Sequence, residues 1–188
     1  MNLNELKDIA YQCAVAHGWH KESLTDDHWL CLVISELMEA VEADRKNKHA
    51  DVELFNYIID DNLREKHLYG SEYELSYVQV FENYIKDSVE DELADACIRL
   101  LDYAGLKGYD LDNYDYEGSD TEDYSDMTFT EAVFCIVKYI TDNFYKPDEL
   151  LNEIFAFSAS IKVNIMWHIQ EKMKYNQLRS YKHGNKAY

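Results

Sequence analysis

The feature that most constrains this chain is a pair of short acidic motifs with helical spacing. Glu36 and Glu39 are separated by two residues, and so are Glu92 and Asp95. Residues three apart are neighbours on one face of an α-helix, so each motif offers two adjacent carboxylates. If the two helices pack together, four like charges meet in a half-buried place, which is unfavourable without a cation. Oxygen ligands favour a hard ion, so the motifs predict a site for Mg²⁺ or Mn²⁺.

Both motifs lie in stretches whose apolar residues recur at helical spacing. Around the first motif the apolar stripe consists of Leu30, Val33, Ile34, Leu37 and Val41. Around the second it consists of Leu93, Cys97, Leu100, Leu101 and Ala104. The alternative interpretation is a solvated acidic face with an Asp95–Arg99 ion pair. Two acid pairs, each in an unusually apolar helix, favour a buried metal site over that alternative.

Three blocks of the sequence, taken in order, follow the pattern of a known enzyme family. They are Gly18-Trp19 with residues 32–45, residues 91–102, and a tail with the spacing Lys-x-x-x-Asn-x-x-Arg at Lys172, Asn176 and Arg179. Together they resemble the MazG-like, all-α nucleoside triphosphate pyrophosphohydrolases, a superfamily that also includes dimeric dUTPase-like enzymes. That family carries Glu-x-x-Glu followed by Glu-x-x-Asp. The resemblance covers about 80 of the 188 residues.

The resemblance implies one all-α domain over residues 1–188, a multi-helix bundle of the all-α NTP pyrophosphatase type with helical insertions. It implies Mg²⁺-dependent hydrolysis of a nucleoside triphosphate between the α- and β-phosphates, which gives the monophosphate and pyrophosphate and serves nucleotide-pool housekeeping. It also implies a homodimer or homotetramer. The aromatic content of 14% agrees with an oligomer, because one small core does not need so many rings.

The resemblance assigns a role to each candidate site residue. The metal ligands are Glu36, Glu39, Glu92 and Asp95, and either Glu36 or Glu39 takes the proton of the attacking water. Lys172 and Arg179 hold phosphate oxygens and Asn176 binds phosphate or sugar, although cations at a helix C-terminus have a purely structural explanation as well. Arg99 either binds phosphate or neutralises Asp95. Trp19 either stacks on the base or fills the core.

Residues 46–87 depart from the short family pattern, because 52 residues separate Glu39 from Glu92. This helical insertion is rich in Tyr and Phe. Packing within or between subunits is the first interpretation of it, and a substrate lid is the second. Residues 109–126 form an acidic, Tyr-rich segment with the composition of a solvated loop.

Periodicity and capping signals predict the remaining elements. Helices are expected over 3–17, 27–45, 51–66, 72–87, 88–106 and 131–144, with Thr130 as the cap of the last of these. One long helix is expected from Pro147 to the basic tail, since proline suits a first helical turn. The chain contains a single proline and six glycines. Because these residues break helices and mark turns, their scarcity agrees with long helices.

Charge and cysteine usage limit the partners and the compartment. The net charge of −19 argues against binding to a nucleic acid or to an anionic membrane surface. The four cysteines are scattered, without a Cys-x-x-Cys motif, and are expected to be reduced residues of a cytoplasmic protein. A nucleoside triphosphate is therefore the expected partner, with no nucleic acid and no membrane.

Other chemistries fit the sequence less well. A di-iron bundle requires Glu-x-x-His, which does not occur. The histidines and cysteines lack zinc spacing, and there is no glycine-rich phosphate loop or nucleophile elbow. The alternative that stays open is a catalytically inactive, metal-stabilised helical scaffold or interaction protein. Hydrolysis of a panel of nucleoside triphosphates distinguishes the two.

Overall fold

The computed structural model describes residues 2–111, 122–142 and 146–179, and every regular element in these ranges is a helix. This confirms the all-α prediction. The helices are α1 (Leu3–Ala16), α2 (Asp26–Arg45), α3 (Val52–Arg64), α4 (Gly70–Tyr84), α5 (Val89–Lys107), α6 (Phe129–Thr141), α7 (Pro147–Ser160) and α8 (Ile165–Gln177). None of the helices described is long and apolar enough to cross a lipid bilayer.

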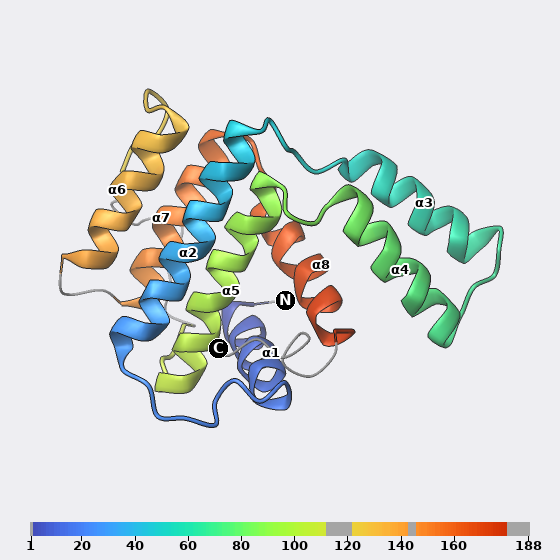
Figure 1. Cartoon of the computed structure of the whole chain (residues 1–188), viewed down its shortest axis with the longest axis horizontal. Coiled ribbons are helices and arrows are strands. Elements are labelled where there is room, and N and C mark those ends of the chain that lie inside the picture. Colours follow the sequence, from blue (N-terminus) through green and yellow to red (C-terminus); the bar gives the residue numbers. More distant parts are fainter. Residues whose placement is uncertain (1, 112–121, 143–145, 180–188) are drawn as a thin grey trace.

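Helix α5 lies at the centre of the bundle and packs against α1, α2, α7 and α8 (Figure 1). Its apolar stripe is fully buried, as expected, at Leu93, Cys97, Leu100, Leu101 and Ala104. Ser88 caps its N-terminus by accepting a hydrogen bond from the Asp91 amide, and Gly108 ends it in a left-handed conformation with φ 69°. The helix predicted to carry the second acid pair is therefore the main support of the fold.

Helix α2 runs antiparallel beside α5 (Figure 1). Leu30, Val33 and Leu37 from its predicted stripe are buried, and Ile34 and Val41 pack at the edge of the same core. Because the two helices lie side by side in opposite directions, the first acid pair comes to the level of the second. The packing of the two apolar stripes thus brings both motifs to one side of the bundle.

The predicted insertion, residues 46–87, contains the helical hairpin α3–α4, which extends sideways from the bundle (Figure 1). It has its own small apolar cluster, distinct from the main core. The members are Phe55, Tyr77, Val80, Phe81 and Ile85, joined by Tyr175 from α8. Phe81 stacks on Tyr175 with ring centroids 4.4 Å apart, so aromatic packing attaches the hairpin to α8.

The prediction of one long C-terminal helix from Pro147 is wrong, because the chain forms two helices there, α7 and α8. Lys162 takes a left-handed conformation with φ 63°, and the Val163 amide donates to the Ser158 carbonyl. The Asn164 side chain then caps α8 by accepting from the Trp167 amide. Glycine or proline usually marks such a helix end in a sequence, but here the left-handed residue is a lysine. The apolar periodicity therefore predicted one continuous helix across this position.

Two smaller expectations also need correction. Thr128, not Thr130, caps α6, in a capping box with Glu131. Most of the acidic segment 109–126 lies outside the described residues, but Tyr124 near its end is buried rather than solvated. The Tyr124 hydroxyl donates to Glu153 of α7, so this end of the segment belongs to the core.

Candidate metal and nucleotide site

One pocket of about 560 Å³ lies among α1, α2, α5, α8 and the loop that follows α1. All nine residues that the sequence nominated line this pocket. They are Trp19, Glu36, Glu39, Glu92, Asp95, Arg99, Lys172, Asn176 and Arg179. Tertiary packing therefore collects residues from positions 19 to 179 around a single hollow. None of its lining residues comes from α3 or α4, and the insertion contributes only Lys86 and Asp87, which follow α4.

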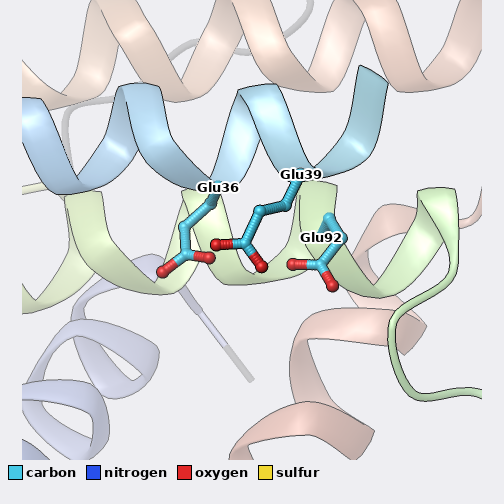
Figure 2. Close-up of side chains that lie close together, drawn as sticks. All are labelled: Glu36, Glu39 and Glu92. Carbon is cyan, nitrogen blue, oxygen red and sulfur yellow. The ribbon is translucent and has the colours of Figure 1, made fainter. Parts of the chain in front are cut away.

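Three carboxylates from two helices lie close together (Figure 2), and all three residues line the pocket. Glu36 and Glu39 extend from α2 and Glu92 from α5, and one oxygen from each lies within 4.8 Å of the others. Glu36 and Glu92 are buried, whereas Glu39 is exposed. The spacing of the motifs predicted four crowded carboxylates, and this group contains three of them.

Protein cations neutralise part of this negative charge. Arg99 Nε donates to Glu36 Oε1 at 2.9 Å. Lys172 Nζ lies 2.7 Å from Asp91 Oδ2 and 2.8 Å from Asp95 Oδ2. In place of the alternative Asp95–Arg99 pair, Arg99 contacts Glu36, and Lys172 contacts both Asp91 and Asp95, so that each of the three contacts joins different helices. These contacts fix α2 and α8 against α5 at the pocket wall.

Burial and mutual repulsion shift the pKa values of these acids. Burial, followed by the negative charge of Asp95, raises the pKa of Glu92 to about 8. The same two causes raise the pKa of Glu36, although the Arg99 guanidinium opposes them. Burial also raises the pKa of Asp91 to about 6 against the attraction of Lys172. A cation that binds here therefore competes with protons at neutral pH.

The acid group suits a hard cation, because Glu36, Glu39 and Glu92 offer only carboxylate oxygens at close range. A second group of close carboxylates consists of Asp87, Asp91 and Glu92, which shares Glu92 with the first. Asp91 Oδ1 is buried and has no hydrogen-bond partner among the described residues. Asp95 belongs to neither group and is engaged by Lys172, although its charge acts on both Glu36 and Glu92, so the first group unites three of the four predicted ligands.

The basic and amide residues of α8 lie along another wall of the pocket. Lys172 is only 3% exposed, and two carboxylates already compensate its charge. Asn176 has a buried Oδ1 without a partner in the described structure. The Arg179 guanidinium lies over the Tyr175 ring at 5.6 Å, and its carbonyl contacts His17 Nε2 at 3.0 Å. Asn176 of α8 and Arg179, which lies just beyond this helix, therefore have unused hydrogen-bonding capacity towards a ligand.

The structure adds pocket residues that were not nominated from the sequence. Asp102 lies on the same face of α5 as Asp95 and Arg99, so its spacing was a usable signal. It is held by His20, whose Nε2 lies 2.7 Å from Asp102 Oδ1. Lys86 and Asp87 enter the pocket from the turn before α5, where Asp87 has φ 57°. No sequence pattern marked that turn.

No protein-family model, curated protein or solved structure matches this chain.

Proposed function

We propose that this protein is a metal-dependent nucleoside triphosphate pyrophosphohydrolase that cleaves between the α- and β-phosphates. The observation that carries the proposal is the three-carboxylate group of Glu36, Glu39 and Glu92 at one end of a pocket whose other walls bring Arg99, Asn176 and Arg179. An anionic substrate needs positive charge beside such acids, and this pocket supplies groups of both kinds. The resemblance to MazG-like enzymes supports the same reaction.

The three glutamates would hold Mg²⁺, or Mn²⁺, through their carboxylate oxygens. A bound divalent cation neutralises phosphate oxygens and stabilises the charge that develops on the leaving pyrophosphate. Glu39 is the exposed member of the group and Glu36 is oriented by Arg99. One of these two carboxylates takes the proton from the attacking water.

Arg179 and Asn176 would bind the phosphates and the sugar. A guanidinium can contact phosphate through two parallel N–H groups, and Arg179 has no ion pair within the described residues. The unpartnered Asn176 Oδ1 would accept a hydrogen bond from a sugar hydroxyl. Lys172 also lines the pocket, where its contacts with Asp91 and Asp95 would hold it in place, and its binding to phosphate stays a prediction.

One observation favours the alternative of an inactive scaffold. Arg99 and Lys172 already pair with Glu36, Asp91 and Asp95, so internal ion pairs account for much of the acidic charge without a metal. In that case the cluster stabilises the contact of α2 and α8 with α5 and performs no chemistry.

The deciding experiment incubates the protein with each common nucleoside triphosphate and Mg²⁺ and identifies the products by ion-exchange chromatography. We expect monophosphate and pyrophosphate, and no product when the metal is removed by chelation. Glu39→Gln should abolish the reaction, whereas Glu42→Gln, a change at an exposed position outside the pocket on the same helix, should leave it unchanged. Diphosphate with orthophosphate would refute α–β cleavage, and Mg²⁺ binding without hydrolysis of any nucleotide would favour the scaffold.

A further inference from the structure

The pocket has chemically different ends along the axis of α5. Glu92 lies towards the N-terminus of this helix and Asp102 towards its C-terminus, and both line the pocket. Ten residues of α-helix span about 15 Å. The acid group of Figure 2 occupies the first end, and Arg99 lies between the two ends. The distance corresponds to the length of an extended nucleotide, so phosphates at the acid end place a base near Asp102.

The end around Asp102 has the surfaces that a flat ring requires. Helix α1 contributes the small side chains of Ala10 and Ala14 to the pocket wall, and Ile98 comes from α5. Helix α1 approaches α5 closely here, because Gly105 lies against Tyr11. Trp19 lines the same pocket, and it directly precedes His20, which contacts Asp102. Apolar walls that enclose one polar group are the usual composition of a site that orients a small ligand.

Asp102 is a fixed hydrogen-bond acceptor at this end. Its Oδ1 accepts from His20 Nε2 at 2.7 Å, and both side chains are only 7% exposed. The His20 ring is itself held between Tyr11 and Trp29, with centroids 5.1 and 4.9 Å away. Within the described residues Asp102 makes no other hydrogen bond, so Oδ2 is left to accept from a ligand.

We propose that Asp102, oriented by His20, selects nucleobases that present an exocyclic amino group over bases that present a carbonyl oxygen at the same position. This inference rests on the proposed function, since it takes the ligand to be a nucleotide. An ionised carboxylate accepts hydrogen bonds and cannot donate them. It therefore binds an amino group, whereas it repels a carbonyl oxygen and loses its own partner when buried against one.

The test uses pairs of nucleotides that differ by an amino-to-carbonyl exchange, which also places a hydrogen on the adjacent ring nitrogen. CTP is compared with UTP, and ATP with ITP, by their kcat/KM values with Mg²⁺. A hydrogen bond to a charged group changes the ratio by about tenfold or more, so the amino member of the better-bound pair should be preferred by at least that factor. Equal values within both pairs, or a preference for UTP and ITP, would overturn the inference. This comparison needs only the unaltered protein.

Asp102→Asn sharpens the test. The asparagine Oδ1 can still accept from His20 Nε2, which leaves Nδ2 in place of the free carboxylate oxygen. Because Nδ2 donates, the preference should fall towards unity or reverse in favour of UTP and ITP. Asp8→Asn, at an exposed position of α1 outside the pocket, is the matched control and should keep the parent ratio. A parent-like ratio in Asp102→Asn would assign the selectivity to another residue.

Direct binding separates this inference from the hydrolase proposal. Titration calorimetry with CMP and UMP, and with AMP and IMP, in the absence of metal measures base selection without any reaction. Selective binding of the amino members without hydrolysis of triphosphates would refute the hydrolase and retain the role of Asp102. Hydrolysis with equal kcat/KM values within both nucleotide pairs would retain the hydrolase and refute the role of Asp102. Failure of all four monophosphates to bind would count against a base site at Asp102.

Discussion

At the scale of single residues, the Lys172 ammonium is a buried charge held between two carboxylates. It is 3% exposed and contacts Asp91, which is 1% exposed, and the half-buried Asp95. Burial alone would lower the pKa of Lys172, but Asp95 and Asp91 raise it above its ordinary value. The lysine is therefore charged at every physiological pH, and it provides the counter-charge for the two aspartates.

Lys172→Met tests this dependence through stability. The substitution keeps the length of the side chain but leaves Asp91 buried without a counter-charge, so we expect a loss of about 3–5 kcal/mol in the free energy of unfolding. Urea denaturation monitored by circular dichroism measures it. The double variant Lys172→Met with Asp91→Asn should recover much of the loss, because the unpaired charge is gone. A loss below about 1 kcal/mol in the single variant would mean that water or another group compensates Asp91.

At the scale of elements, the close approach of α1 to α5 shapes the end of the pocket near Asp102. A Cβ atom on Gly105 would lie 2.5 Å from Tyr11 Cβ and 3.0 Å from Tyr11 Cγ. Two helices can approach in this way only where one of them lacks a side chain. The glycine therefore has a packing role in addition to any weakening of its helix.

We expect Gly105→Ala to destabilise the protein by about 1–3 kcal/mol, because overpacking outweighs the gain in helix propensity of roughly 1 kcal/mol. Gly108→Asn is the control: φ is 69° there, no atom lies within 4 Å of an added Cβ, and asparagine tolerates the left-handed region. Thermal melts of both variants check the prediction. An increase in stability for Gly105→Ala would show that α1 moves away from α5 at little cost.

At the scale of the whole molecule, we expect the acids of the pocket to make stability depend on pH and on metal. The pKa of Glu92 is raised to about 8 in the folded protein, against about 4.3 for an unperturbed glutamate. The folded state therefore binds more protons than the unfolded state between these values. In the metal-free protein, this site should therefore lower the free energy of unfolding as pH rises from about 4.3 to about 8.

Mg²⁺ should reverse this loss at neutral pH, by about 2.7 kcal/mol at a hundredfold excess over its dissociation constant. Glu39→Gln removes one charge and one ligand, so its stability without metal should equal or exceed that of the parent, with little gain from Mg²⁺. Melts of both proteins with chelator and with Mg²⁺ supply the comparison. A parent protein that shows no shift, even with a non-hydrolysable triphosphate present, would mean that these acids do not form a metal site.

The α3–α4 hairpin also belongs to this scale, since its packing cluster is separate from the main core. It exposes several large apolar side chains, namely Leu54, Tyr57, Leu63, Tyr69 and Leu75. The homodimer or homotetramer stays a prediction.

The sequence alone determined the helical class, the two central helices and nine of the residues that line the pocket. Periodicity predicted the buried stripes of α2 and α5, and the spacing of the acids placed each pair on one helix face. These are local properties, since a helix repeats every 3.6 residues whatever its surroundings. The resemblance to the family motif then nominated Lys172, Asn176 and Arg179 as pocket residues. Periodicity alone does not identify them.

Only the tertiary structure decided how those residues are paired. Arg99 contacts Glu36 rather than Asp95, Lys172 is buried between two aspartates, and His20 fixes Asp102. Each of these contacts joins residues at least 60 positions apart, which local spacing does not encode. The break between α7 and α8 at Lys162 is not marked by a glycine or proline in the sequence. Partners across helices depend on the depth and rotation at which the helices pack, and the whole core sets both together.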